Sequence, residues 1–166
     1  MTPIYPPMRR KDRLLDEATT RRILEAGEYG VLATASVQTG ALATPLSYSV
    51  EGDALYFHGA RTGHKLENSK GEPHACFCVV GKTQPAFADG DFTSFFESAL
   101  AFGPVRLVED EAEKRRALEA ICRKYLPEYE AEIESALKRS YSVTQVLCLD
   151  IMHVTGKAKR AAPGPE

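Results

Sequence analysis

The sequence predicts a mainly β protein, an antiparallel barrel of six strands with peripheral helices. The first observation is a series of short, partly β-branched apolar runs joined by tight turns that contain glycine, which is typical of an antiparallel meander. The second is that strands adjacent in sequence dominate, without a regular alternation of strand and helix. This pattern excludes a doubly wound parallel fold and favours a small barrel with attached helices.

The first part of the chain is predicted to form a helix and three strands. Residues 16–27 (DEATTRRILEAG) form the helix, because Asp16 or Thr19 can cap its first amides and Gly27 suits a left-handed position after its end. The strands are expected at 29–36, 41–50 and 54–58, separated by the turn sequences QTG and EGD. Pro45 interrupts the second run, so this strand is expected at a sheet edge or at a bulge.

The middle of the chain is predicted to contain one or two helical turns and two more strands. The turns are expected at 62–69, where the alternation is lost, and the strands at 74–81 and 92–108. Between these strands, residues 82–91 (KTQPAFADGD) are expected to form a loop.

Two helices and a last strand complete the expected fold. Asp110 can cap the first helix, whose apolar stripe contains Leu118, Ile121, Cys122 and Tyr125. Pro127 ends this helix and opens a second one. Residues 143–154 alternate in polarity and return to the sheet as the sixth strand.

Length and charge restrict the possible classes of protein. The chain has 166 residues, which suits one domain, expected at 13–157 between a flexible arm (1–12) and a flexible tail (158–166). A net charge of −2 gives no electrostatic reason to expect nucleic acid or a membrane surface as a partner. The N-terminus lacks the apolar stretch of a secretion signal, so we expect a cytoplasmic protein whose four cysteines are free thiols.

The segment 57–65 (FHGARTGHK) is the strongest candidate for a binding site. A strand ends there, Gly59 and Gly63 allow a ligand to approach the backbone, and a helical turn begins with His64 and Lys65. Free amides at a helix start together with a lysine favour an anion such as phosphate. On spacing alone, a glycine-rich turn with a solvated lysine is an equally good interpretation. No Walker motif and no GxGxxG occurs.

Six segments, in order, carry a family resemblance: VLATAS, PLSY, LYFHGARTGHKLEN, CFCVVGKT, FESALAFGPVRLVED and LDIMHVTGK. Together they resemble the nitroimidazole-resistance branch of the FMN-binding split-barrel superfamily, the relatives of pyridoxamine 5′-phosphate oxidase. The resemblance covers roughly residues 8–159 and implies a split β-barrel that binds FMN at a homodimer interface. The chain has His64-Lys65 in place of the oxidase's Arg-Lys pair and lacks its terminal Arg-x-His, so oxidation of pyridoxamine phosphate is not expected.

The resemblance also implies which residues hold the cofactor. The isoalloxazine ring would be lined by Val31, Leu32, Ala33 and Thr34 and flanked by Pro45, Leu46 and Ser47. The ribityl chain would run beside His58, Gly59 and Ala60, with Phe57 and Gly63 completing the set, and the phosphate would be held by His64 and Lys65. The partner subunit would contribute the region of Lys82, Thr83, Glu97 and Ser98.

The reaction implied is electron transfer by the flavin. A nicotinamide donor would reduce FMN, which would pass electrons to a small flat acceptor such as a nitroaromatic or a quinone, with His58 as a candidate proton donor. Two alternatives stay open: a flavin carrier or sensor without turnover, and a split barrel that binds haem or a deazaflavin instead. For His58, a packed, hydrogen-bonded core histidine is the competing interpretation.

No metal site is predicted. His74, Cys76 and Cys78 share one face of a strand, but residues two apart on a strand lie ~6.5–7 Å apart and do not easily converge on a tetrahedral ion. We expect Cys76, Cys78, Cys122 and Cys148 to pack as small apolar side chains. Arg9 and Arg10 are expected to be a solvated charge cluster, with a contact across a dimer as the alternative.

Overall fold

The computed structural model describes residue 5 and residues 7–36, 40–63, 68, 74–88 and 90–161. The described helices are α1 (Glu17–Ala26), α3 (Glu111–Tyr125) and α4 (Ile133–Ser140). The described strands are β1 (Leu14–Leu15), β2 (Gly30–Ser36), β3 (Gly40–Leu46), β4 (Ser49–Glu51), β5 (Ala54–Ala60), β6 (His74–Ala88), β7 (Asp91–Leu107), β8 (Thr144–Asp150) and β9 (His153–Lys159). The mainly β class is therefore confirmed.

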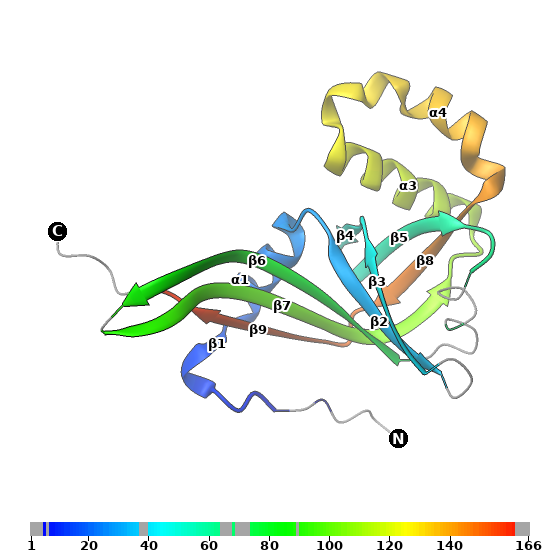
Figure 1. Cartoon of the computed structure of the whole chain (residues 1–166). Helices are drawn as coiled ribbons and strands as arrows, with labels where there is room; N and C mark the ends of the chain where they lie inside the picture. The colour runs from blue at the N-terminus through cyan, green and yellow to red at the C-terminus, as the bar shows by residue number, and fades with distance from the viewer. Residues whose placement is uncertain are drawn as a thin grey trace.

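The strands form one antiparallel sheet that curls into a split barrel (Figure 1). The strand order is β3-β2-β6-β7-β8-β5-β4, and β9 pairs with β7 and β1. The two ends of this path, β3 and β4, are consecutive in the chain and are joined by Ser47 and Tyr48. Among the described residues no pairing joins β3 to β5, so the barrel is split along this line.

The sheet has nine strands, and the expectation of six is wrong in number. The predicted strand 41–50 bends into β3 and β4 at Ser47-Tyr48, and the predicted strand 143–154 bends into β8 and β9 at Ile151-Met152. At these corners the backbone finds partners outside the strand: the Tyr48 amide donates to Tyr125 Oη at 3.0 Å, and the Met152 amide donates to the Phe102 carbonyl at 2.8 Å. The short strand β1 completes the nine.

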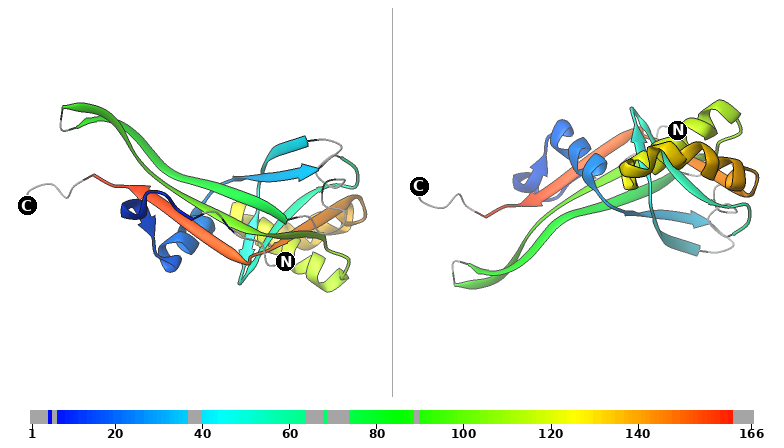
Figure 2. Two further views of the ribbon diagram at one scale, coloured as in Figure 1. Left: turned by 90° about the horizontal axis from the view of Figure 1, so that it is seen from below. Right: turned by 90° about the horizontal axis from the view of Figure 1, so that it is seen from above.

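The prediction of a loop at 82–91 is wrong. Most of this segment belongs to the strands of a hairpin that projects from the barrel (Figure 2). We call residues 81–97 the β6–β7 arm. Pro85 is tolerated there because β2 pairs only with residues 76–78 of β6, which leaves one side of the arm as a free edge. The register shifts between Val80 and Thr83, so that Glu97 faces a bulge at Gly81-Lys82. Pro45 likewise lies in an edge strand, β3, as predicted.

Helix α1 covers the inner face of β6, β7 and β9 and begins as expected. Asp16 accepts a hydrogen bond from the Thr19 amide at 2.8 Å, which confirms it as the cap. The prediction of a left-handed Gly27 is wrong, because its φ is −66°. A glycine is needed there for space, since an added Cβ would overlap Val79 and lie 2.6 Å from Tyr48 Oη.

Two apolar clusters make the core. The first fills the barrel around Leu24, Leu32, Tyr48, Phe57 and Phe77. The second lies between β5, β8 and the helices α3 and α4, and it includes Leu118 and the fully buried Cys148. Of the predicted α3 stripe, Leu118 and Ile121 are buried, whereas Cys122 and Tyr125 are half-buried.

Polar contacts fasten α3 to the sheet. Asp110 caps the helix, as predicted, by accepting from the Glu113 amide at 2.7 Å. Arg106 on β7 donates to Glu113 at 2.7 Å and to Asp150 at 2.9 Å. Tyr56 donates to the same Glu113 carboxylate at 2.9 Å. None of the helices within the described ranges is both long and apolar enough to cross a membrane.

Candidate functional site

One side of the split is formed by β2 and β3, which carry the residues predicted to line and flank the isoalloxazine ring. Val31 lies opposite Pro45 in the β2–β3 register, and Ala33 lies opposite Ala43. Pleating sends Leu32 and Thr34 into the core, where both are buried, while Val31 and Ala33 lie on the outer face of the sheet. Pro45 and Ser47 are exposed and Leu46 is half-buried, so this end of β3 is accessible from solvent.

The end of β5 forms the other side of the split. Phe57 is fully buried, with its ring 4.9 Å from that of Phe77, so its side chain serves the core. His58 is exposed and lies opposite Val146, on the face away from the barrel interior. His58 is therefore not a core residue, and its role near the flavin stays a prediction. Gly59 is half-buried and Ala60 is exposed.

The backbone after β5 has the freedom that the sequence suggested. Gly63 has a φ of +137°, a value that favours glycine, and no atom of the described residues lies within 4 Å of an added Cβ. The predicted phosphate ligands His64 and Lys65, and most of the predicted helical turns at 62–69, lie outside the described residues.

One polar contact crosses the split and was missed from the sequence. The Asn68 side chain donates to Thr34 Oγ1 at 3.2 Å, and both side chains are buried. This bond ties the segment that follows β5 to the inner face of β2. An asparagine in a polar stretch such as LENSK gives no sign of such burial in the sequence.

The residues that each subunit is predicted to contribute to the cofactor of the other subunit lie apart from the split. Lys82 at the bulge lines a cleft of about 590 Å³ together with Val80, Gly81 and Glu97 of the sheet and with Gly27, Glu28 and Tyr29 after α1. Thr83 is exposed, and Ser98 is half-buried opposite Val80. Since β6 runs antiparallel to β2, this cleft lies beyond the start of β2, at the end away from Thr34.

The outer face of the sheet is apolar and mostly half-buried. Paired residues share a face, so the register places Ala33, Cys76 and Phe102 in one row and Val31, Cys78 and Leu100 in the next. On this face Val80 is 61% exposed, and at the arm's tip Phe92 is 86% exposed. The Tyr5 ring stacks on His153 at 4.7 Å at the edge of the same face.

The expectation that Cys76 and Cys78 of β6 pack as apolar side chains in the core is wrong. Ala75, Phe77 and Val79 point into the core, and Cys76 and Cys78 are half-buried on the opposite, outer face. Burial raises the pKa of Cys76 to about 11, and it also raises that of Cys78. Both thiols therefore stay protonated at neutral pH, which makes them poor nucleophiles. Within the described ranges, no three His, Cys, Asp or Glu side chains group as metal ligands.

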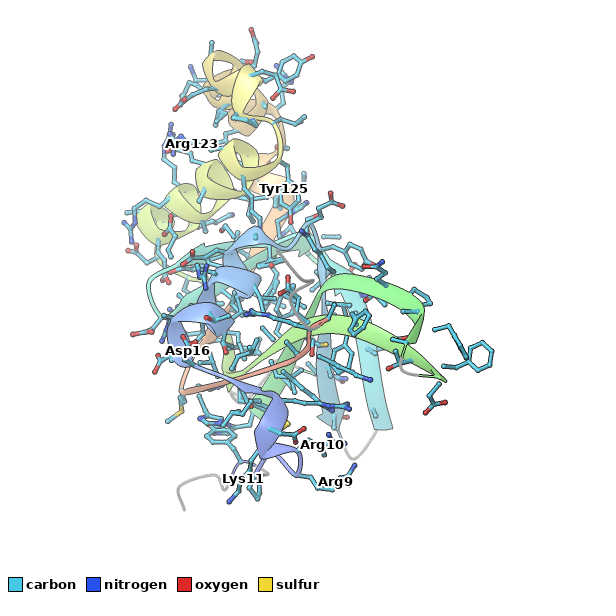
Figure 3. All side chains as sticks on the ribbon, turned by 90° about the vertical axis from the view of Figure 1, so that its left-hand side faces the viewer. Arg9, Arg10, Lys11, Asp16, Arg123 and Tyr125 are labelled. Atoms are coloured by element: carbon cyan, nitrogen blue, oxygen red, sulfur yellow. The ribbon has the colours of Figure 1, made fainter. Side chains whose placement is uncertain are left out.

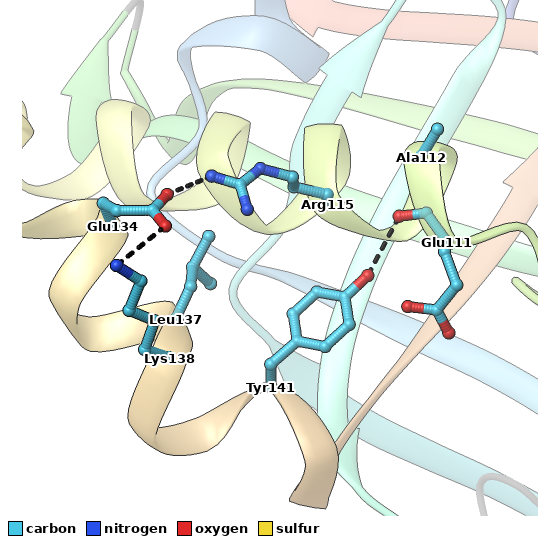
Figure 4. A pocket seen from close by; sticks show the side chains of 7 residues that line it. All are labelled: Glu111, Ala112, Arg115, Glu134, Leu137, Lys138 and Tyr141. Atoms are coloured by element: carbon cyan, nitrogen blue, oxygen red, sulfur yellow. Dashed lines mark hydrogen bonds and ion pairs between the residues drawn. The ribbon is translucent and has the colours of Figure 1, made fainter.

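Charged side chains in other parts of the molecule form ion pairs with one another at the surface. Arg10 donates to Asp12 at 2.6 Å near the N-terminus (Figure 3). A cleft of about 500 Å³ between α3 and α4 (Figure 4) is lined by Glu111, Ala112, Arg115, Glu134, Leu137, Lys138 and Tyr141. Its polar groups satisfy one another: Glu134 pairs with Arg115 and Lys138, and Tyr141 donates to the Glu111 carbonyl. None of the predicted site residues lines it.

Comparison with known proteins gives the family. The family model described as pyridoxamine 5′-phosphate oxidase matches residues 16–158. The chain belongs to this family. The match covers both sides of the split, the bulge and the β6–β7 arm, and it confirms the resemblance found in the sequence. Among curated proteins, no relative matches the chain.

Solved structures share the fold at low sequence identity. A proposed 5-nitroimidazole antibiotic resistance protein from Bacteroides thetaiotaomicron has 21% identity and a TM-score of 0.72, over 87% of this chain and 86% of that one. The flavocytochrome Anf3 from Azotobacter vinelandii has 23% identity and a TM-score of 0.75, over 96% and 75%. The FAD and heme binding protein from Mycobacterium smegmatis has 19% identity and a TM-score of 0.76, over 91% and 75%. These likenesses show the split-barrel fold.

Proposed function

We propose that the protein binds FMN along the split between β3 and β5 and acts as a flavin-dependent oxidoreductase. The observation that carries this is that Val31 lies opposite Pro45 on one side of the split, while Ser47 at the end of β3 and His58 on β5 are both exposed to solvent. Family membership supports it, because flavin-binding proteins share this fold. FMN is favoured over FAD because the sequence offers one short phosphate segment and no second loop for a pyrophosphate.

We propose that a second copy of the chain completes the site. The apolar outer face and the exposed arm resemble half of an obligate homodimer interface, which commonly buries ~2,000 Å² or more. Covering this face would bring Lys82, Thr83 and Ser98 of one subunit towards the split of the other. The cofactor would then lie at the interface between the two copies.

In this proposal the protein provides position, charge and a proton. Bound FMN would supply two-electron chemistry, accepting hydride from a nicotinamide donor and delivering it to a nitroaromatic or quinone acceptor. The main chain of β2, with the small side chains Val31 and Ala33, would let a flat ring lie close to the sheet. The exposed His58 imidazole would donate a proton to a reduced acceptor.

Identification of the chromophore tests the proposal. We expect yellow protein whose released chromophore is FMN, and apoprotein that quenches FMN fluorescence on titration. Lys65→Ala should weaken FMN binding about 10- to 150-fold, since a hydrogen bond to a charged group is worth ~1.5–3 kcal/mol, and should leave riboflavin binding almost unchanged. Lys138→Ala, on the exposed face of α4, is the matched control. Colourless protein that binds no FMN, or release of haem or a deazaflavin, would refute the assignment.

A further inference from the structure

The cleft that Lys82 lines lies at the end of the surface proposed for the flavin ring. Tyr29 also lines this cleft, and it is the residue directly before β2. Side chains along an extended chain alternate between its two sides, so Tyr29, Val31 and Ala33 point to the same side, each ~6.5–7 Å from the next. A flat ring that rests on Val31 and Ala33 would therefore end next to Tyr29 and the cleft.

Lys82 gives a second indication that this cleft borders a flavin. The resemblance assigns Lys82 to the cofactor of the other subunit, whereas Tyr29 lies next to the proposed ring surface of its own subunit. In the proposed homodimer the cleft thus borders bound flavin on either assignment. A cleft next to the flavin ring is where a small electron acceptor would bind.

Tyr29 presents an accessible aromatic ring at this cleft. The residue is 62% exposed, and Val80, which lines the same cleft, is 61% exposed. Extending the β2–β6 register by two residues beyond Val31 and Cys78 places Tyr29 next to Val80. These two side chains offer an exposed apolar surface on which a second flat ring can stack.

The backbone that carries Tyr29 is held on both sides. The Glu28 carbonyl accepts a hydrogen bond from Tyr125 Oη at 2.5 Å (Figure 3 shows Tyr125 on α3). Gly30 lies directly against β6, because an added Cβ would be 2.7 Å from the Cys78 carbonyl oxygen. The Tyr29 ring is therefore presented from a fixed main chain, which lowers the entropy cost of binding a ligand against it.

The charged side chains of the cleft are accessible and have no ion-pair partner. Glu28 and Lys82 are exposed, and Glu97 is half-buried. None of these three side chains forms an ion pair or a hydrogen bond within the described part of the chain. Gly81 leaves room for Glu97, whose Cγ and Oε1 would lie 2.7 and 2.9 Å from an added Cβ, so this carboxylate lies over the bulge. Two carboxylates and one ammonium give the lining a net charge of −1.

We propose that this cleft binds the electron acceptor and selects flat aromatic acceptors that are neutral or cationic over anionic ones. The acceptor's ring would stack on Tyr29, and the excess of negative charge would favour an ammonium substituent and disfavour a carboxylate. This inference rests on the proposed flavin function and adds the place and the charge of the substrate. Neither Tyr29 nor Glu28 is among the residues that the resemblance assigns to the cofactor.

Calorimetry with three nitroaromatic probes of similar size tests the proposal. The probes are 4-nitrobenzylamine, 4-nitrobenzyl alcohol and 4-nitrobenzoate, titrated at pH 7 into the purified protein without an electron donor. An exposed charge pair contributes ~0.2–1 kcal/mol, and the amine and the benzoate differ by two charges. The amine should therefore bind about 2- to 25-fold more tightly than the benzoate, with the alcohol between them. Benzoate binding as tight as that of the amine, or no binding by any probe, would overturn the proposal.

Variants identify the residues. Tyr29→Ala should weaken binding of the alcohol about 2- to 12-fold, since contact between aromatic rings contributes ~0.5–1.5 kcal/mol, and Tyr29→Phe should leave it unchanged. Glu97→Gln should abolish the preference for the amine, and Lys82→Met should increase it. Tyr129→Ala and Glu25→Gln are the matched controls, because both residues are exposed and neither lines the cleft.

The visible absorbance of the same samples separates this inference from the flavin proposal. Protein without bound FMN would refute the proposed function. Protein that holds FMN, but in which Tyr29→Ala leaves all three affinities unchanged, would refute only the acceptor cleft. If Tyr29→Ala does not fold, an amine preference that neither Glu97→Gln nor Lys82→Met changes would overturn the proposal.

Discussion

Replacing Gly27 with alanine distinguishes two reasons for the glycine after α1. Its φ of −66° suits any residue, so backbone strain is not involved. An added Cβ would overlap Val79 Cγ1 and lie 2.6 Å from Tyr48 Oη. Both neighbours are fully buried, and the Tyr48 hydroxyl donates to the Leu24 carbonyl, so neither can move freely.

The expected cost follows from these contacts. Overpacking a filled core costs ~1–3 kcal/mol, and disturbing the Tyr48 hydrogen bond adds ~0.5–1.5 kcal/mol. The lower entropy of the unfolded chain returns ~0.4–1 kcal/mol. Gly27→Ala should therefore lower the free energy of unfolding by ~0.5–4 kcal/mol, which for a chain of this size lowers Tm by roughly 1–16 °C. Urea and thermal unfolding followed by far-UV circular dichroism measure both quantities.

A double-mutant cycle identifies the cause. Val79→Ala removes the overlapping methyl, so Gly27→Ala should cost clearly less in the Val79→Ala background. Gly52→Ala is the matched control, because its φ is +57° and no atom of the described residues lies within 4 Å of an added Cβ. Its cost should be the same with or without Val79→Ala. Equal costs of Gly27→Ala in both backgrounds would refute the steric explanation.

Three further predictions concern stability and reactivity. Gly103→Ala should prevent folding or remove several kcal/mol of stability, because its Cβ would overlap the backbone carbonyl of Asp150; a soluble variant with unchanged Tm would contradict this. The hydrogen bond from Arg106 lowers the pKa of Glu113, so this carboxylate contributes stability above its unfolded-state pKa that is lost as the pH falls. Arg106→Met should therefore flatten the acid side of the pH–stability profile, and an unchanged acid limb would count against it. Cys76, with a pKa of about 11, should react slowly with a disulfide reagent at pH 7 and faster as the pH rises, and a fast reaction at pH 7 would show a thiolate.

The fold class could be predicted because most strands follow local patterns. The runs at 29–36 and 54–58, the cap at Asp16 and the cap at Asp110 depend on neighbours in sequence, and all four are confirmed. The arm could not be predicted in this way. Its proline and glycine are typical of a loop, and only pairing with the other strand of the hairpin makes Pro85 acceptable at a free edge.

In the candidate site, too, contacts between strands adjacent in sequence could be predicted, and contacts between distant segments could not. The pairing of Val31 with Pro45 follows from two neighbouring strands, so the sequence could suggest it. The contact between Asn68 and Thr34 joins residues 34 positions apart, and no local pattern indicates it. The side on which Cys76 and Cys78 lie depended on knowing which face of β6 the helix α1 covers. A period of two fixes that they share a face, and it leaves open whether that face is the core.

The places where the sheet bends are also the places where polar side chains leave the ladder. At Ser47-Tyr48 the strand leaves one half of the barrel for the other, and the turn exposes Ser47 while it buries Tyr48. Because Tyr48 cannot continue the ladder there, its amide donates to Tyr125, and this bond fixes the end of α3 with Lys124 over the Tyr48 ring. At Gly81-Lys82 the bulge turns Lys82 towards a cleft instead of into a ladder position. Regular strands hold the barrel together, and its irregular points are where polar and charged side chains leave the ladder.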